Sequence, residues 1–183
     1  MPTHVATHLI MGATAAGKTA LIRGFLAERP ADEHWAVLMN DFGAARIETR
    51  DAVTVREVSG CACCTGQVVL RAALVRMLRD ARPRRLFIEA SAAARPASVL
   101  AVLREEGIAS AINLRASVCV VNALHFADAR WHEREDYREQ IACAARLIVN
   151  EGDDAAISAL AALHKTAKVI DARDGPVSLS AIE

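Results

Sequence analysis

Apolar and polar positions divide the 183-residue chain into alternating segments of two kinds. The first kind is a short run that is apolar on both faces, which is typical of strands in a parallel sheet covered by helices on both sides. The second kind repeats its apolar residues every three or four positions, which predicts amphipathic helices. We therefore predict an α/β fold with three layers, α/β/α, around a mostly parallel sheet. The predicted strands are residues 4–11, 35–39, 53–58, 86–88, 116–121, 147–149 and 168–170.

The predicted helices are residues 19–28, 67–81, 97–106, 139–146 and 155–164. Pro83 is expected to end the second of these helices, Pro96 suits the first turn of the third, and Gly107 is expected to cap its end. Residues 125–137 are mostly polar, and we expect a loop or an exposed helix there. The chain length and the lack of any internal repeat fit a single domain, residues 1–183.

The motif G-x-x-x-x-G-K-[ST] stands between the first predicted strand and the first predicted helix. Its two glycines allow successive backbone N–H groups to face an anion, and the following helix N-terminus adds partial positive charge. Lys18 would reach the β and γ phosphates, and the Thr19 hydroxyl would bind Mg²⁺. The motif in this context indicates a P-loop NTPase. The expected phosphate-binding residues are Gly12, Ala13, Thr14, Ala15, Ala16, Gly17, Lys18 and Thr19.

Glu89 directly follows the strand predicted at residues 86–88. Ligands of parallel sheets bind beyond the carboxyl ends of the strands, so we expect its carboxylate to lie opposite the phosphate loop. There it could hold a Mg²⁺-bound water or orient the water that attacks a phosphate. Lys18 and Glu89 are therefore the predicted catalytic residues. The alternative for Glu89 is an ordinary carboxylate at a strand end.

Three of the five cysteines, Cys61, Cys63 and Cys64, lie within four residues after the third predicted strand. Ordinary disulfides among them would be strained. Their thiolates could instead converge on one Zn²⁺ or a similar soft or borderline divalent ion. The alternative is a cysteine-rich turn that holds no metal. Cys119 lies within a predicted strand and Cys143 within a predicted helix, so both are expected to pack in the core.

The 22 Lys and Arg residues balance the 22 Asp and Glu residues, so no overall field favours nucleic acid or a membrane surface as partner. No basic segment followed by an apolar run stands at the N-terminus, and no stretch approaches the ~20 apolar residues of a membrane span. We expect a cytoplasmic protein. Of the six histidines, His4 and His8 are expected to be structural, and His125 and His132 to face solvent.

Together these residues resemble the CobW-type GTPases, relatives of the HypB and UreG metallochaperones. The most specific match is residues 60–64, which spell the family's G-C-x-C-C signature. The other matching segments are residues 40–43 for the N-E-F-G switch, 89–96 for E-x-S-G…P, 120–123 for V-V-D-A, and 150–153 for the guanine motif N-K-x-D.

The resemblance implies a nucleotide-binding domain over essentially the whole chain. It implies GTP or GDP, Mg²⁺ and Zn²⁺ (or a similar divalent metal) as cofactors and a client metalloprotein as partner. A homodimer is also compatible with it. The implied guanine-binding residues are Asn150 and Asp153. A carboxylate suits guanine because it accepts hydrogen bonds from N1–H and the 2-amino group, whereas adenine presents an acceptor at N1. Asp153 could also cap the following helix. Candidates for a fourth zinc ligand are Asp41, a water molecule and a client residue.

The chain departs from the family pattern at several positions. Ala92 replaces the glycine whose N–H would sense the γ phosphate, and Glu151 replaces the lysine whose stem lies along the base. Asn122 replaces an aspartate, and Arg46 stands where the family usually carries a carboxylate. We expect these changes to impair turnover more than nucleotide binding. The family's smaller C-terminal domain is expected to be absent, because the sequence ends just after its last predicted strand.

The leading hypothesis is a GTP-binding metallochaperone that hydrolyses GTP slowly and delivers zinc to a client. Switch segments ordered by γ phosphate and Mg²⁺ would link nucleotide state to the cysteines. The alternative is a catalytically degenerate nucleotide-binding module that stores or senses zinc. A P-loop kinase is disfavoured, because no lid for an acceptor substrate is evident and the cysteines would have no role.

Overall fold

The computed structural model describes residues 4–40, 47–58, 64–126 and 128–183. Its centre is one sheet of parallel strands in the order β3-β2-β4-β1-β6-β7-β8, with β5 paired to β1. β5 pairs with the first half of β1, and β6 pairs with its last residues. The strands are β1 (Val5–Gly12), β2 (Trp35–Met39), β3 (Val53–Glu57), β4 (Arg85–Glu89), β5 (Ile112–Leu114), β6 (Val118–Asn122), β7 (Arg146–Glu151) and β8 (Lys168–Asp171).

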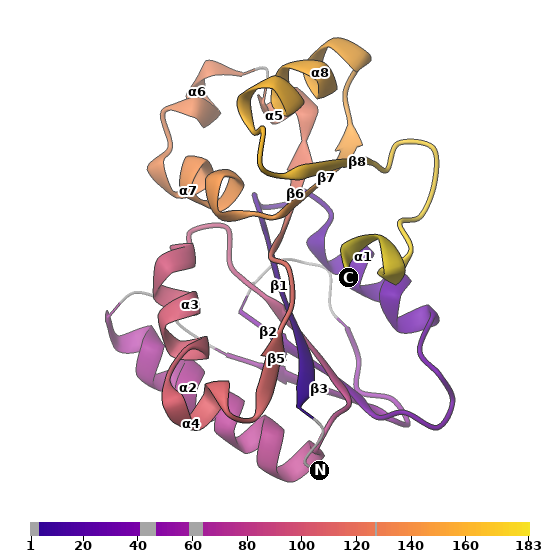
Figure 1. Ribbon diagram of the computed structural model, residues 1–183, viewed down its shortest axis with the longest axis vertical. Helices are drawn as coiled ribbons and strands as arrows, with labels where there is room; N and C mark the ends of the chain where they lie inside the picture. Colours follow the sequence, from indigo (N-terminus) through magenta and orange to yellow (C-terminus); the bar gives the residue numbers. More distant parts are fainter. Residues whose placement is uncertain (1–3, 41–46, 59–63, 127) are drawn as a thin grey trace.

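Helices cover both faces of this sheet, as Figure 1 shows. The helix α1 and the C-terminal 3-10 turn η1 lie on one side, and α2, α3, α4 and α7 lie on the other. This arrangement confirms the predicted three-layer α/β fold. The helical segments are α1 (Lys18–Ala27), α2 (Cys64–Ala81), α3 (Pro96–Leu103), α4 (Glu106–Ala109), α5 (Ala123–Phe126), α6 (Ala129–His132), α7 (Glu135–Cys143), α8 (Asp154–Leu163) and η1 (Leu179–Ile182).

The core fixes α1, the helix that follows the phosphate loop, against the middle of the sheet. Phe25 of α1 stacks on Phe87 of β4 with ring centroids 5.7 Å apart, and Trp35 of β2 meets the same ring edge-on at 5.8 Å. All three side chains are fully buried, and burial of large aromatic rings is among the strongest contributions to core packing. The loop at the start of α1 is therefore attached to a helix that is tightly packed on the sheet.

Strand register brings the carboxyl ends of the central strands to one level. Glu89 at the end of β4 pairs with Ile10 of β1 and with Met39 of β2. Gly12 at the end of β1 pairs with Val120 of β6. The segments that leave these strands therefore start side by side at one sheet edge.

Some predicted elements differ from the structure. The helix predicted at residues 97–106 is two helices, because Glu105 adopts an extended conformation between α3 and α4. Gly107 therefore lies inside α4 and does not cap the longer helix. The sequence analysis also missed β5, which has only three residues. The helix predicted at residues 139–146 is α7, which starts at Glu135 and ends at Cys143.

The segment predicted to be exposed at residues 125–137 is partly packed. Trp131 stacks on His125 with ring centroids 4.4 Å apart and contacts Tyr137 at 5.3 Å. Tyr137 is buried, and burial raises the pKa of its hydroxyl. The expectation that His125 faces solvent is therefore wrong, since its ring is half-buried against Trp131.

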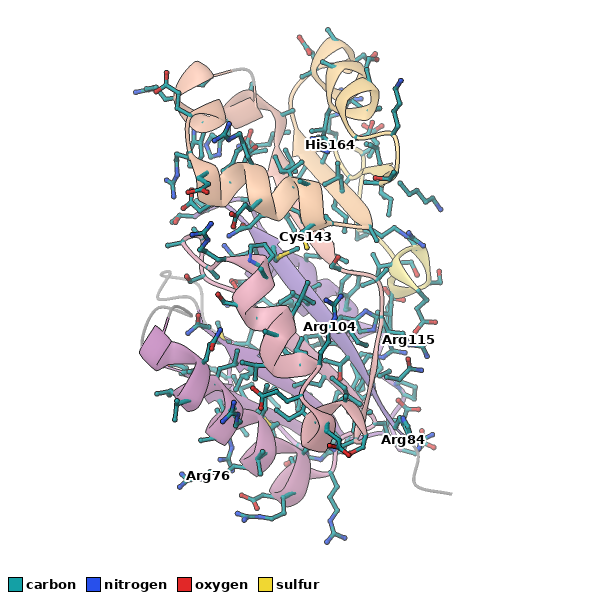
Figure 2. The ribbon with its side chains drawn as sticks, turned by 60° about the vertical axis from the view of Figure 1, so that its left-hand side comes forward. Arg76, Arg84, Arg104, Arg115, Cys143 and His164 are labelled. Carbon is teal, nitrogen blue, oxygen red and sulfur yellow. The ribbon has the colours of Figure 1, made fainter. Side chains whose placement is uncertain are left out.

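The two isolated cysteines differ in environment. Cys119 is fully buried in β6, as predicted, and burial raises the pKa of its thiol to about 12. Cys143 is exposed, contrary to the prediction of core packing, because it is the last residue of α7 (Figure 2). Within the described ranges, no helix combines the length and the apolar character needed to cross a lipid bilayer.

Candidate functional site

The loop between β1 and α1 adopts a backbone conformation that requires small residues. Gly12 and Gly17 have φ angles of 141° and 98°, which favour glycine. A Cβ on Gly12 would lie 2.4 Å from the Val120 carbonyl oxygen, and one on Gly17 would lie 2.7 Å from the Asn150 amide nitrogen. Ala15 also has a positive φ, 61°, so this loop holds one strained non-glycine residue. The predicted role of the two glycines thus has a direct steric basis.

Three backbone donors of this loop have no partner within the described chain. The N–H groups of Thr14, Ala15 and Gly17 donate to no described residue, whereas Ala16 N–H closes a turn onto the Ala13 carbonyl at 3.2 Å. The N-terminus of α1 follows directly and contributes partial positive charge. Unengaged N–H groups beside a helix N-terminus form the kind of site that binds phosphate.

Lys18 is buried, and its ammonium group lies against the loop. Its Nζ donates to the carbonyl oxygens of Gly12 and Ala13 at 3.0 and 2.9 Å. Such carbonyls are weaker acceptors than an anion, so a phosphate at the loop could compete for this ammonium group. The geometry brings together the charge and the donors that the motif predicts.

Thr19 and Glu89 are also brought together. The Thr19 hydroxyl donates to Oε1 of Glu89 at 2.7 Å, across the gap between α1 and the end of β4. Glu89 is 1% exposed. A hydroxyl and a carboxylate adjacent to a phosphate loop are oxygen ligands of the type that Mg²⁺ prefers. The predicted juxtaposition of Glu89 with the loop is therefore present, while its function stays a prediction.

Hydrogen bonds join the carboxyl ends of β2, β3 and β4, the last of which is Glu89. Asn40 is buried, its N–H donates to the Glu89 carbonyl at 2.8 Å, and its amide nitrogen donates to the Val58 carbonyl at 2.9 Å. The Val58 N–H in turn donates to the Met39 carbonyl at 2.8 Å. The segments that start at residues 41 and 59 therefore leave from neighbouring points.

The predicted metal ligands themselves are mostly outside the described residues. Asp41, Cys61 and Cys63 lie there, and Cys64 is the first residue of α2, without a described side chain. Within the described part of the chain, no three His, Cys, Asp or Glu side chains gather as a metal site. The metal assignment thus stays a prediction, supported by the common origin of the two segments at one sheet edge.

The predicted base-binding residues lie at the opposite flank of the loop. The Asn150 amide nitrogen donates to the Ala16 carbonyl, so the end of β7 contacts the phosphate loop. Asp153 caps α8, because its Oδ1 accepts from the Ala156 N–H at 2.8 Å. The capping alternative for Asp153 is therefore present. Its carboxylate is exposed, and recognition of guanine stays a prediction.

Two contacts that the sequence analysis missed hold the segment of residues 150–154. Arg173, just after β8, donates to the Gly152 carbonyl at 3.2 Å and to the Asp154 carboxylate at 2.6 Å. The Asn122 amide donates to the Glu151 carboxylate at 2.6 Å. The two family departures at positions 122 and 151 therefore contact each other. Neither contact has a local sequence signal, because each joins segments far apart in the chain.

Gln140 of α7 is a further residue that the sequence analysis missed. It is fully buried, and it bonds to both Gly12 and the turn of residues 91–94 that follows β4. Its position on the apolar face of α7, with Tyr137, Ile141 and Ala144, could have marked it as a buried polar residue.

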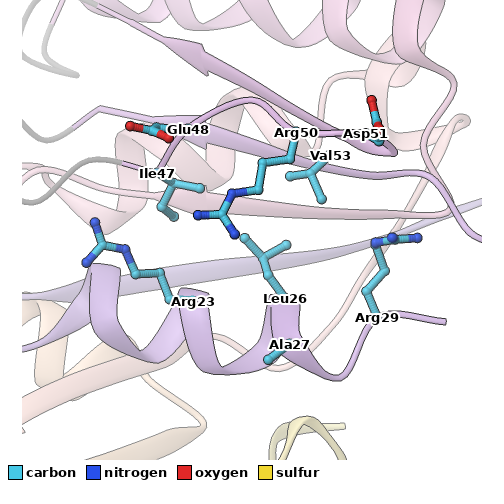
Figure 3. A pocket seen from close by; sticks show the side chains of 9 residues that line it. All are labelled: Arg23, Leu26, Ala27, Arg29, Ile47, Glu48, Arg50, Asp51 and Val53. Atoms are coloured by element: carbon cyan, nitrogen blue, oxygen red, sulfur yellow. The ribbon is translucent and has the colours of Figure 1, made fainter. Parts of the chain in front are cut away.

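Two cavities flank α1. One, of about 210 Å³, adjoins the phosphate loop and one of the two predicted base-binding residues, Asn150. It is lined by Gly17, Ala20, Leu21, Asn150, Ala172 and Pro176 among others. The other, of about 500 Å³, lies between α1 and residues 47–53, where Arg23 and Arg50 point into the same space (Figure 3). This larger cavity contains no residue of the phosphate loop. The smaller one is the better candidate for a nucleoside, because it shares Gly17 and Asn150 with the loop.

The sequence is similar to that of a curated protein. The chain is 32% identical over 152 residues to the zinc chaperone YeiR of Escherichia coli (strain K12). The matched region covers 80% of this chain and 46% of that protein. The chain thus spans about half the length of this curated relative.

Solved structures share the fold. Zn(II)-bound YjiA GTPase from E. coli superposes with a TM-score of 0.74 at 21% identity, over 98% of this chain and 61% of that chain. The hydrogenase maturation factor HypB from Archaeoglobus fulgidus gives 0.60 at 14% identity, over 97% and 83%. Residues 6–176 match the family described as CobW/HypB/UreG, nucleotide-binding domain. The chain therefore belongs to the CobW/HypB/UreG family of nucleotide-binding domains.

Proposed function

We propose that the chain binds a guanine nucleotide with Mg²⁺ at residues 12–19 and hydrolyses GTP slowly. In this proposal nucleotide state is coupled to zinc held by the cysteine segment, as in a metallochaperone that supplies a client metalloprotein. The observation that carries the proposal is the phosphate loop: its Thr14, Ala15 and Gly17 N–H groups donate to no described residue, and Lys18 lies within it.

The residues present fit a nucleotide with Mg²⁺. A Cβ would fill the loop at Gly12 and Gly17, so the space there depends on glycine. Thr19 and Glu89 would hold the metal ion, which when bound neutralises charge on the phosphates. Lys18 would exchange its bonds to the Gly12 and Ala13 carbonyls for stronger bonds to phosphate oxygens. Glu89 would orient the attacking water, and its burial suits it to a site from which bulk water is excluded.

Zinc binding is proposed at Cys61, Cys63 and Cys64, with Asp41 as the candidate fourth ligand. Three thiolates and a carboxylate are a ligand set that suits Zn²⁺. The hydrogen bonds of Asn40 support this grouping, because they join the strand ends from which both segments leave. The name of the relative YeiR, a zinc chaperone, favours the same metal. Delivery to a client, a homodimer and a cytoplasmic location remain part of the proposal.

A second candidate is a catalytically degenerate nucleotide-binding module that stores or senses zinc. Two observations favour it. Ala92 adds a methyl group where the family has glycine, and Glu151 is hydrogen-bonded to Asn122, where the family has a lysine along the base. Turnover of bound GTP separates the two candidates, since the second predicts none.

The test is a titration with fluorescent GDP, GTP and ATP analogues, with Lys18→Ala as the loop variant and exposed Lys165→Ala as its control. Loss of a charge-assisted bond costs about 1.5–3 kcal/mol, so Lys18→Ala should weaken every nucleotide roughly 10- to 100-fold. Lys165→Ala should change nothing. Unchanged binding by Lys18→Ala would exclude the loop as the phosphate site.

Base recognition is tested separately with Asp153→Ser. Serine keeps the cap of α8, because it is as good an N-cap as aspartate, but it lacks the carboxylate. The preference for GTP over ATP should therefore fall while the thermal stability stays close to the parent's. A preference that survives in this variant would show that Asp153 only caps the helix.

A further inference from the structure

We propose that Gln140 is a positioning residue that couples the phosphate loop to the turn of residues 91–94. Gln140 lies in α7, 128 residues from Gly12 in sequence, and its side chain is fully buried. Its Oε1 accepts a hydrogen bond from the Gly12 N–H at 2.9 Å. Its Nε2 donates to the carbonyl oxygens of Ala94 and Ala92 at 2.9 and 3.0 Å, with Ser91 further away at 3.4 Å. One amide group thus holds both segments.

The contact orients the backbone of the turn. In a trans peptide the carbonyl and the N–H of one unit point to opposite sides. Because the carbonyls of Ser91 and Ala92 face Gln140, the N–H groups of Ala92 and Ala93 face away from it. Neither N–H donates to any described residue. The turn itself is closed by the Ala94 N–H, which donates to the Ser91 carbonyl at 2.9 Å.

Gln140 is the buried part of a wider contact between α7 and this turn. Arg95 donates to Glu139 at 2.6 and 3.2 Å and to Glu135 at 3.2 Å. These three side chains are substantially exposed, so the ion pairs contribute little to the free energy of the contact. A buried amide whose partners would be left unsatisfied is far more costly to remove. The coupling therefore depends on Gln140.

The consequence concerns discrimination between nucleotides, and it rests on the proposed nucleotide binding at residues 12–19. The turn follows Glu89, which is bonded to Thr19, so it borders the end of the site where a terminal phosphate would lie. A diphosphate would engage the loop alone, whereas a triphosphate would also engage the turn. Gln140 sets the distance between the two, and its loss should alter the ratio of the two affinities.

Two variants separate the two halves of the contact. Gln140→Glu keeps an acceptor for the Gly12 N–H, removes the donor to the turn and sets a carboxylate against its carbonyls. It should weaken both nucleotides, because a buried negative charge would stand beside the loop, and it should weaken a non-hydrolysable GTP analogue roughly tenfold more than GDP. Gln140→Met removes both halves and should weaken both nucleotides. Gln67→Glu is the matched control, because among the described residues Gln67 donates only to the Ser98 carbonyl, at 3.4 Å, and it should leave the ratio unchanged.

The measurement is isothermal titration of each variant with both nucleotides, together with amide hydrogen exchange of the parent. In the parent, the GTP analogue but not GDP should slow exchange in residues 91–94 and in α7. An unchanged affinity ratio in Gln140→Glu, or equal protection of α7 by both nucleotides, would overturn the coupling role. A parent that binds neither nucleotide would instead overturn the proposed function, and this role with it.

Discussion

Ala92 is the residue at which the proposed chemistry meets its strongest obstacle. Its side chain is half-buried in the turn after β4, and its carbonyl is held by Gln140 at 3.0 Å. The N–H of Ala92 donates to no described residue, but in the proposed function its methyl group would crowd the place of the γ phosphate. Lys18 and Glu89, in contrast, lie at the phosphate loop, and their catalytic role stays a prediction. The loop residues therefore support the proposed nucleotide binding, whereas Ala92 is an argument against rapid turnover.

Ala92→Gly should raise the rate of GTP hydrolysis by the isolated chain. We expect a rise of about tenfold, which corresponds to a barrier lower by about 1.4 kcal/mol. The measurement is single-turnover hydrolysis with GTP prebound, and Ala93→Gly at the exposed neighbouring position is the control. An unchanged rate with GTP still bound would show that the methyl group does not limit turnover.

His8 predicts how stability depends on pH. Its ring is fully buried in β1, stacked on Phe87 and in contact with Arg85. Burial, aided by the charge of Arg85, lowers its pKa from 6.5 to about 4. Below pH 6.5 His8 is protonated in the unfolded chain but stays neutral in the folded chain. The free energy of unfolding therefore falls as pH drops from about 6.5 to 4.

The pKa difference corresponds to a loss of about 3 kcal/mol over that interval. His8→Gln keeps a neutral acceptor near Arg85 and should remove most of this pH dependence. Urea unfolding at pH 7 and pH 4.5 measures it, with exposed His4→Gln as the control. Equal loss of stability in His8→Gln and the parent would contradict the assignment.

Single residues differ in how well sequence alone predicts them. The position of Lys18 and Thr19 at the start of α1 was predictable because the motif is continuous and stands between a strand and a helix; their roles stay predictions. Gln140 and Arg173 were not, because their partners Gly12 and Gly152 lie far away in sequence and only the fold brings them together. The environment of Cys143 was mispredicted because the end of α7 comes there, which exposes a position that a longer helix would have buried.

At the scale of elements, apolar runs predicted the long strands correctly because each is buried on both faces. β2 and the last four residues of β4 are buried throughout, and their short length favours strands over helices. β5 was missed because three residues carry no periodicity. The division of α3 from α4 depends on Glu105, which is extended and pairs with Arg71 of α2 at 2.5 Å. That contact is tertiary, so local pattern could not indicate it.

Two glycines, Gly152 in the loop after β7 and Gly24 in α1, should respond in opposite ways to substitution by alanine. Gly152 has a φ of 118°, and a Cβ there would lie 2.3 Å from Cβ of Ala123. Gly152→Ala should therefore displace residues 150–154 and weaken nucleotide binding. Gly24 lies within α1, and a Cβ there would meet nothing within 4 Å, so Gly24→Ala should stabilise the chain by about 0.5–1 kcal/mol.

Thermal unfolding and nucleotide titration of both variants check this prediction. The expected pattern is lower affinity for Gly152→Ala and a raised midpoint of unfolding for Gly24→Ala. Parent-like affinity in Gly152→Ala would mean that the position of this loop does not matter for the ligand.

At the scale of the whole molecule, the parallel sheet gathers every proposed site at one edge. The phosphate loop, Glu89, and the strand ends that lead to Asp41 and the cysteines all lie at the carboxyl ends of β1 to β4. In the proposed function, a ligand bound at one of these strand ends would act on the neighbouring ends through shared hydrogen bonds, such as those of Asn40. Coupling between nucleotide and metal is therefore the central claim for the molecule.

Linkage makes this claim quantitative. If a nucleotide changes zinc affinity by some factor, zinc must change nucleotide affinity by the same factor. Typical couplings of ~1–3 kcal/mol correspond to about 5- to 150-fold. Zinc uptake should also weaken as pH falls, because the proposed ligands are thiolates that protons compete for.

The most direct test is a zinc competition titration of the chain alone, with GDP and with a non-hydrolysable GTP analogue, beside a Cys61/Cys63/Cys64→Ser triple variant. We predict one tightly bound Zn²⁺ per chain, an affinity that differs at least fivefold between the GDP and GTP-analogue forms, and loss of this binding in the triple variant. A single zinc affinity in all three nucleotide states, or full zinc binding by the triple variant, would contradict the account.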